Sequence, residues 1–178
     1  NWNGQRGAVT WVGPGASLTG VVSASNSLVG TQAGDQVGSV VQVLDDGHYL
    51  VRSTNWNGQR GAVTWGNADV GVVGEVSALN SLVGSTAGDR IGNTLQFLGN
   101  GNYVTSSYFW SGNRGAATFL DGSGPVVGDV SSANSLVGTQ ANDNVGVAIT
   151  TLEDGHYLVR SETWNGYRGA VTWGSGTS

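Results

Sequence analysis

The stretch Asn1-Trp-Asn-Gly-Gln-Arg-Gly-Ala-Val-Thr-Trp11 occurs four times in the chain. It returns unchanged at Asn55–Trp65, and altered copies run from Phe109 to Phe119 and from Thr163 to Trp173. The copies start at positions 1, 55, 109 and 163, a constant step of 54 residues without insertion or deletion. A fixed period of this length is the signature of a repeat architecture, so this stretch decides how the chain is divided.

The period predicts three full repeats preceded by a partial one. The partial repeat, an edge strand, spans 1–16, and the full repeats span 17–70, 71–124 and 125–178. The three full repeats also share the run Asn-Ser-Leu-Val-Gly at one position. We therefore expect one structural unit in each repeat.

Each full repeat contains two β-type runs around a tight turn. In the first repeat, Ser39–Leu44 and Tyr49–Ser53 flank Asp46-Gly47. Asp-Gly and Asn-Gly pairs tolerate positive φ at both centres of a type I′ turn, so they predict a hairpin tip. The third run is Gly61–Trp65 and the fourth is Gly71–Ser77. The equivalent turns of the later repeats are Asn100-Gly101 and Asp154-Gly155.

No window of the sequence has the apolar spacing of an amphipathic helix, so we predict an all-β fold of tandem 54-residue, four-stranded antiparallel units. Such a unit is typical of a β-propeller blade. On the same phase we expect the repeat cores to contain the following residues: Leu28, Leu82, Leu136, Val41, Leu95, Ala148, Leu44, Leu98, Leu152, Val51, Thr105 and Val159.

Three runs of the repeat also carry a family resemblance. Gly34–Gly38, Tyr49–Ser53 and Gly61–Trp65 together resemble a blade of the bacterial FG-GAP (integrin-α-type) propellers, as in large secreted haemagglutinin-like surface proteins. Many blades of that family carry a calcium loop of the pattern Asp-x-Asp-x-Asp-Gly. The hairpin here has only Asp45-Asp46-Gly47, too few oxygens for the roughly six to eight ligands of calcium, so we expect no metal and no other cofactor.

Three blades are too few to close a propeller ring, since such rings have about four to eight. The chain can pair with copies of itself, belong to a longer array, or close as a threefold β-prism or β-trefoil. Both ends carry the same Trp-bearing strand, at 1–16 and 163–178, and an unpaired edge strand is a template for another chain. We therefore expect copies of the chain itself as partners, in an oligomer or a head-to-tail filament.

The composition excludes several other partners. Only 11% of the residues are charged and the net charge is −5, which argues against nucleic acid. No stretch of 18 apolar residues is present, so we expect no membrane insertion. The chain contains no Lys, Met or Cys, which suits a durable extracellular or cell-surface protein. Because Asn1 is not a translation start, we expect a removed leader or a piece of a longer protein.

The recurring loop Trp-Asn-Gly-x-Arg-Gly is the candidate binding site. An aromatic plate beside amide and guanidinium donors suits a carbohydrate, with glycans as possible partners. The alternative is structural, with Trp packed between units and Arg bound to loop carbonyls. The candidate residues are Trp2, Asn3, Arg6, Trp56, Asn57, Arg60, Trp110, Arg114, Trp164, Asn165 and Arg168.

Two further sets of polar residues recur, and we expect structural roles for both. His48 and His156 follow hairpin turns, and Asn102 replaces them in the middle repeat, so we interpret them as turn residues. Asp35, Asp89 and Asp143 precede a Val-Gly or Ile-Gly pair, where Asp typically caps loop amides. No Ser/His/Asp order, phosphate loop or zinc spacing is present, so we assign no catalytic residue.

The sequence therefore favours a non-enzymatic extracellular repeat module of a secreted surface adhesin or filament protein, which assembles through its terminal strands. The alternative is a lectin-like protein with repeated Trp, Asn and Arg sites, where several weak sites act together.

Overall fold

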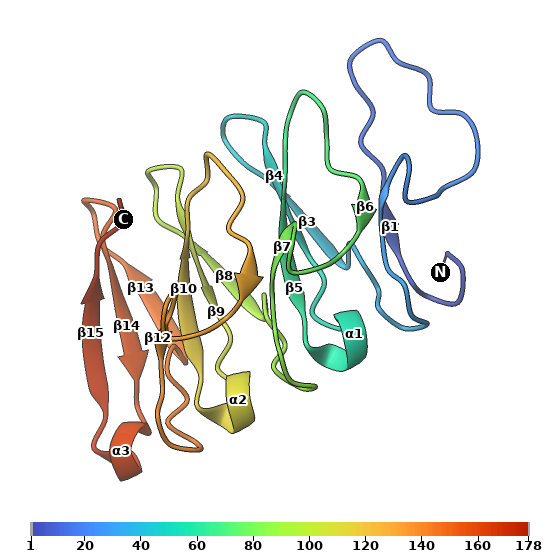
Figure 1. Cartoon of the computed structure of the whole chain (residues 1–178). Helices are drawn as coiled ribbons and strands as arrows, with labels where there is room; N and C mark the ends of the chain where they lie inside the picture. The colour runs from blue at the N-terminus through green and yellow to red at the C-terminus, as the bar shows by residue number, and fades with distance from the viewer. Residues whose placement is uncertain (1, 178) are drawn as a thin grey trace.

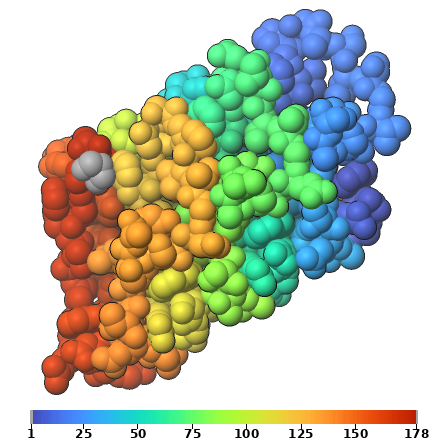
Figure 2. All heavy atoms as spheres, viewed as in Figure 1, coloured from blue at the N-terminus to red at the C-terminus, as the bar shows by residue number. Residues whose placement is uncertain are grey.

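The computed structural model describes residues 2–177, so Asn1 and Ser178, the outermost residues of the predicted repeats, lie outside the described residues. Short strands form four small sheets that follow one another in a row from the N-terminal to the C-terminal end (Figure 1). The space-filling view shows the same row as an elongated body with the two ends of the chain far apart (Figure 2).

The strands of the N-terminal half are β1 (Ala8–Val9), β2 (Leu28–Val29), β3 (Val40–Val43), β4 (Tyr49–Arg52), β5 (Ala62–Gly66), β6 (Gly74–Glu75) and β7 (Ser81–Val83). Those of the C-terminal half are β8 (Thr94–Phe97), β9 (Tyr103–Ser106), β10 (Ala116–Leu120), β11 (Gly128–Asp129), β12 (Leu136–Val137), β13 (Ala148–Thr151), β14 (Tyr157–Ser161) and β15 (Ala170–Gly174). Three single turns are labelled α1 (Trp56–Gln59), α2 (Trp110–Asn113) and α3 (Trp164–Tyr167).

The repeats interlock through their sheets. The largest sheet has the order β11-β7-β5-β4-β3, in which β3, β4 and β5 come from one repeat and β7 comes from the next. Its last strand, β11, comes from the repeat after that and pairs with β7 in parallel. The other sheets are β1-β2-β6, β12-β10-β9-β8 and β13-β14-β15. A repeat therefore completes the sheets of the repeats before it.

This arrangement confirms the all-β tandem units and departs from the expected ring. No sheet closes among residues 2–177, and the chain ends lie at opposite ends of the row (Figure 1). Neither a propeller ring nor a closed threefold β-prism or β-trefoil is therefore seen. The sheets have three to five strands instead of four, because strands from later repeats extend them, and β6 pairs with β2 in parallel.

The hairpin tips lie where the sequence predicts them, but the turn type is different. The Gly47 N–H donates to Leu44 O at 3.0 Å, and the Leu44 N–H donates to His48 O at 2.8 Å. Gly47 has φ +88°, whereas Asp46 is not in the positive-φ region that a type I′ turn requires at both centres. The loop is therefore a three-residue connection that ends in a left-handed glycine, not a two-residue turn.

Three apolar clusters lie between neighbouring sheets, and most of the expected core residues are in them. Leu28, Leu82, Val51 and Thr105 have no exposed surface. The expectation is wrong at Val41, which is 45% exposed because β3 is the outer strand of its sheet, and at Leu136, which is 38% exposed because β12 is the outer strand of its sheet. Other expected core residues that are also buried are Leu44, Leu98 and Val159, and those that are half-buried are Leu95, Ala148 and Leu152.

Candidate functional site

The predicted Trp-Asn-Gly loops are left-handed backbone turns. In the second copy, Asn57, Gly58 and Gln59 have φ values of +49°, +68° and +65°. Asn and Gly are the residues that adopt this conformation most readily. The backbone therefore accounts for the recurrence of Asn-Gly. The equivalent left-handed residues of the other copies are Asn3, Gly4, Gln5, Ser111, Gly112, Asn113, Asn165, Gly166 and Tyr167.

The first three of these four turns are each bound by the Asp-bearing loop that follows about 30 residues later in the sequence. The N–H groups of Arg90 and Ile91 donate to the carbonyls of Gln59 and Arg60, both at 2.9 Å. A Cβ on Gly61 would overlap the backbone of Ile91, so only glycine permits this approach. The same bonds join the loops of the other repeats. We call this series of alternating loops the loop ladder.

The recurring aspartates connect successive steps of the loop ladder. Asp35 is 1% exposed, and its Oδ2 accepts from the N–H groups of Thr31 and Gln32, both at 2.9 Å. Its Oδ1 accepts from the N–H of Asn57, in the next turn, at 2.8 Å. Asp143 makes the three equivalent bonds, and Asp89 makes two of them, with the N–H groups of Thr86 and Ser111. The predicted amide-capping role is therefore confirmed.

Asp143, the last aspartate of this series, has a carboxyl group with a lowered pKa. Burial opposes the ionisation of Asp143, but the backbone N–H groups of Gln140, Asn165 and Thr139, together with Arg114, hold its pKa below its ordinary value. A carboxylate that accepts several N–H bonds is stabilised in its charged form. Asp143 is therefore an ionised structural group.

The tryptophans of the loops occupy different environments along the row. Trp56 is 8% exposed within an apolar cluster, and Trp110 is half-buried against another. Trp164, in the last repeat, is 38% exposed. A buried indole presents little ring surface to a sugar, so Trp56 has the geometry of a packing residue. The binding of carbohydrate by these loops stays a prediction.

The polar residues of the candidate loops are likewise spread along the row. Asn57, Asn165, Arg6 and Arg60 are half-buried, whereas Asn3, Arg114 and Arg168 are exposed, as Trp2 is in part. The backbone N–H groups of Asn57 and Asn165 bind aspartate, not a free surface. The structure does not gather the predicted residues of different repeats into one site.

The two histidines follow the hairpin turns, as predicted, and each imidazole binds a second loop. The Nδ1 of His48 accepts from the N–H of Ala68 at 2.9 Å, and His156 accepts from Gly176 in the same way. In the middle repeat, the Oδ1 of Asn102 accepts from Gly122 at 3.1 Å. An amide oxygen therefore replaces an imidazole nitrogen. Across residues 2–177, no group of three or more His, Cys, Asp or Glu could hold a metal ion, and no helix is long and apolar enough to cross a membrane.

The Trp-bearing strand that the sequence places at 163–178 exposes apolar side chains at the C-terminal end of the row, and we call this surface the C-terminal face. The runs Ala62–Gly66 and Ala170–Gly174 have the same sequence. Val63 is 3% exposed, but its counterpart Val171 is 65% exposed, and Trp173 is 57% exposed.

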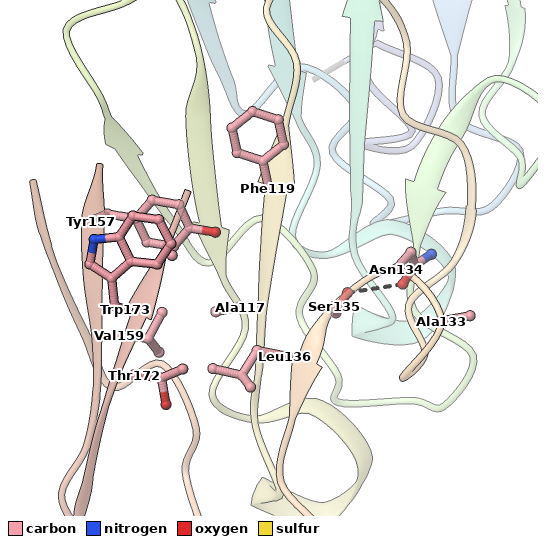
Figure 3. A pocket seen from close by; sticks show the side chains of 11 residues that line it. Ala117, Phe119, Ala133, Asn134, Ser135, Leu136, Tyr157, Val159, Thr172 and Trp173 are labelled. Atoms are coloured by element: carbon pink, nitrogen blue, oxygen red, sulfur yellow. Dashed lines mark hydrogen bonds between the residues drawn. The ribbon is translucent and has the colours of Figure 1, made fainter. Parts of the chain in front are cut away.

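A cavity of about 400 Å³ opens at the C-terminal face, and we call it the terminal pocket. Its apolar lining comes from β10, β12, β14 and β15, with Phe119, Leu136, Tyr157 and Trp173 around it (Figure 3). Among the counterparts of this lining one repeat earlier are Val63, Trp65, Leu82 and Tyr103, which pack in one cluster with Val126 and Val130 of the next repeat. Valines of a following repeat thus fill the equivalent space inside the row.

The N-terminal end has the complementary features, and we call it the N-terminal face. The segment Leu18–Val22 is the counterpart of Val72–Val76, which contains β6, and of Val126–Val130, which contains β11. In this first copy, Leu18 is 66% exposed, whereas its counterparts Val72 and Val126 are half-buried, and no residue of the segment lies in a strand. An apolar segment is therefore exposed at one end, and a pocket of the kind that holds its counterparts is open at the other.

A recurring arginine contact of the interior is incomplete at both ends of the row. Inside the row, the guanidinium of Arg52 donates to Gly92 O at 2.7 Å and to Asn93 O at 2.5 Å. The counterparts of these acceptors, Gly38 and Ser39, line a cavity of about 360 Å³ at the N-terminal face. The counterpart of the donor is Arg160, whose exposed side chain lies 3.0 Å from Glu162.

The chain was compared with known proteins. It matches a family described as a repeat of unknown function (DUF5650) over residues 1–39, 43–93, 97–147 and 151–178. The matches that start at 43, 97 and 151 have the same 54-residue step as the sequence period. A comparison with curated proteins found no match.

Proposed function

The chain belongs to the DUF5650 repeat family, and we propose that it is a non-enzymatic structural module that assembles head to tail through its terminal strands. In this proposal, the module is part of a secreted surface adhesin or filament protein. Its function is to extend the row of interlocked sheets from one copy to the next.

One observation carries the proposal: the run Ala-Val-Thr-Trp-Gly is buried in the interior and exposed at the C-terminal face. Burying a Val or Leu side chain stabilises by about 1.5–3 kcal/mol. In a single copy this stabilisation is missing at three exposed side chains, those of Val171, Trp173 and Leu136. Repeat arrays whose end units lack polar caps tend to associate, because each unit buries its apolar face against a neighbour.

The two end faces differ, so the contact between copies is heterologous. Such a contact forms an open filament unless the rotation between copies closes a ring. The row within the chain is itself open, which supports the filament. The absence of Lys, Met and Cys supports an exterior location, because few sites remain for tryptic cleavage, oxidation or crosslinking.

The proposal is tested by a matched pair of variants, Val171→Asp and Val63→Asp, in sedimentation velocity over a range of micromolar concentrations. The parent chain should form species larger than a monomer. Val171→Asp should remain folded and monomeric, because Val171 is exposed in the single copy. Val63→Asp should unfold the chain, because it places an unpaired charge in a core. A parent chain that stays monomeric at all concentrations would contradict the proposal.

A further inference from the structure

We propose that Asn100-Gly101, at the tip of the middle hairpin, is a site of spontaneous deamidation, and that the loop ladder protects the Asn-Gly pairs of its own turns from the same reaction. The site lies inside the row, so it does not depend on the association of copies. The left-handed turns then have a chemical role beside their structural one.

The reaction is a ring closure between neighbouring residues. The backbone nitrogen of the glycine attacks Cγ of the asparagine and a C–N bond forms. Nδ2 then leaves as ammonia, with the proton that the glycine nitrogen gives up. Water opens the resulting succinimide ring at either of its carbonyls, which gives aspartate or isoaspartate. Glycine favours the attack, because no Cβ crowds the attacking nitrogen.

The backbone of the loop ladder turns is the least favourable one for this attack. Asn57 and Asn165 have ψ values of +58° and +52°. At these values the tetrahedral geometry of an L-residue places the next backbone nitrogen nearly trans to Cβ, so this nitrogen points away from Cγ. Closure of the ring needs the nitrogen nearly eclipsed with Cβ, which requires a rotation of about half a turn in ψ.

Hydrogen bonds on both sides of the turn oppose this rotation. The N–H of Asn57 donates to Oδ1 of the buried Asp35 at 2.8 Å. Two residues later, the carbonyl of Gln59 accepts from the N–H of Arg90 at 2.9 Å. Hydrogen bonds to a carboxylate are stronger than those between neutral groups. Asn57 therefore reaches the reactive geometry only when the loop ladder opens at this step.

Asn100 lies in a different backbone environment. It is exposed at the hairpin tip, between Gly99 and Gly101, whose φ values are +79° and +86°. Asn100 itself does not have a positive φ, so it is not held in the left-handed conformation of Asn57. Because both of its neighbours lack a Cβ, the backbone at Asn100 has more freedom to rotate than the turns of the loop ladder.

The attacking nitrogen is also unbonded in the middle hairpin. In the other two hairpins the glycine N–H, at Gly47 and Gly155, donates to a leucine carbonyl at 3.0 Å. The N–H of Gly101 has no such bond within residues 2–177. The carboxamide oxygen of Asn100 accepts from the N–H of Asn102 at 3.1 Å, which polarises the carbonyl that is attacked. Nucleophile and electrophile are therefore both available at this pair.

The aspartate product fits the fold. Aspartate at position 100 restores the Asp-Gly pair that the other two hairpins have at Asp46 and Asp154. The reaction removes the Nδ2 of Asn100, which donates to the carbonyl of Gly176, but the Nδ2 of Asn102 donates to the same carbonyl at 2.9 Å. Deamidation therefore adds a negative charge to the hairpin tip and leaves this carbonyl bonded.

The unaltered chain tests the proposal, with its own turns as controls. After incubation in mildly alkaline buffer, tandem mass spectrometry of proteolytic peptides locates aspartate and isoaspartate. Asn100 should convert with time, and Asn57 and Asn165 about ten- to hundredfold more slowly, the factor that corresponds to first breaking a hydrogen bond to a charged group. Incubation in guanidinium should bring the three rates together, because each residue is then an ordinary Asn-Gly pair of an unfolded chain.

Two variants test the chemistry at the hairpin tip. Gly101→Ala should slow the conversion of Asn100, because the added Cβ crowds the attacking nitrogen. No atom outside the neighbouring residues lies within 4 Å of that Cβ, so the variant has room to fold. Asn100→Asp should fold like the parent and should coincide in isoelectric focusing with the aged parent chain.

The outcomes separate the modification site from the protection. A folded chain in which Asn100 stays intact, or in which Gly101→Ala does not slow its conversion, would overturn the site. A folded chain in which Asn57 converts as fast as Asn100 would overturn the protection, and so would an equal difference between them in guanidinium. Conversion of Asn100 ahead of Asn57 in the folded chain alone supports both, whether or not copies associate.

Discussion

Two identical runs in this chain, Ala62–Gly66 and Ala170–Gly174, have opposite environments. In the interior, Ala62, Val63 and Thr64 are buried, and the run is paired on one side with β4 and on the other with β7. At the C-terminal face, the run is paired only with β14, and Val171 is 65% exposed. The difference shows that burial in this fold is decided by the neighbouring repeat and not by the local sequence.

The largest expected difference between interior and end is at the recurring leucines. Leu82→Ala should lower the free energy of unfolding by about 2–5 kcal/mol, because Leu82 is fully buried. The matched change Leu136→Ala should cost less than about 1 kcal/mol, because Leu136 is 38% exposed in the single copy. Urea titrations below the concentration of association measure both values. Equal losses would mean that the end repeat is packed like the interior.

The comparison also shows what the sequence can predict. The period, the all-β class, the hairpin positions and the amide-capping role of Asp35 follow from residue types at fixed phase. The turn type was wrong because Asp-Gly serves both two-residue and three-residue loops. The interlocking of repeats was missed although β6 lies in the predicted run Gly71–Ser77, because the pattern of a run does not say which strand it pairs with, and β6 and β11 pair with strands of the preceding repeats.

The exposed core positions could not be predicted from local pattern at all. Val41 and Val51 both belong to β-type runs, yet Val41 is 45% exposed and Val51 is fully buried. The difference depends on which strand lies at the edge of its sheet. In the candidate site, the bonds between each Asn-Gly turn and a loop about 30 residues later could not be predicted, because the partner lies far away in the sequence. The left-handed conformation itself is local, since the fourth turn, at Asn165–Tyr167, adopts it without such a partner.

The second prediction concerns the loop ladder, where equivalent substitutions should cost the same stability in the interior and at the end of the row. Asp89 and Asp143 are 1% and 2% exposed, and each accepts backbone N–H bonds from two loops. Asp89→Asn and Asp143→Asn should each cost about 1.5–3 kcal/mol, the usual value of a hydrogen bond to a charged group. Thermal unfolding at neutral pH measures both. A much smaller loss for Asp143→Asn would show that the ladder frays at the end.

The third prediction uses the pH dependence of the same group. Because the folded protein holds the pKa of Asp143 below its ordinary value, the carboxylate stabilises the fold above about pH 4. This contribution should be lost as the pH falls through the folded pKa. Asp143→Asn should therefore show a weaker loss of stability below about pH 4 than the parent. An unchanged acid dependence of stability would rule out this role of Asp143.

The fourth prediction compares two arginines at equivalent positions. Arg52→Ala should cost about 1–3 kcal/mol, because it leaves the carbonyls of Gly92 and Asn93 without their charged donor. Arg160→Ala should change the stability of the single copy by less than about 0.5 kcal/mol, since its ion pair with Glu162 is at the surface. The same change should weaken association between copies. If association is unaltered, Arg160 takes no part in the contact between copies.

The smallest effect is expected at the hairpin turns. His48→Asn should be nearly neutral, within about 0.5 kcal/mol, because Asn102 accepts the equivalent N–H bond in the middle repeat. His48→Ala should cost about 0.5–1.5 kcal/mol, since it removes the acceptor for Ala68. The difference between the two variants in thermal unfolding isolates the hydrogen bond from the packing of the ring on Trp65.

The most direct test of the account is amide hydrogen exchange in the two identical runs, measured at several protein concentrations. Amides at 62–64 should be protected at every concentration, because β5 is paired on both sides. The outward amides of 170–172 should exchange quickly in the single copy and become protected as concentration rises. Because the two runs have the same sequence, peptides that extend beyond the run are needed to assign the exchange to 62–64 or to 170–172. If 170–172 stays unprotected at concentrations where larger species form, the C-terminal face is not the site of assembly, and the account is contradicted.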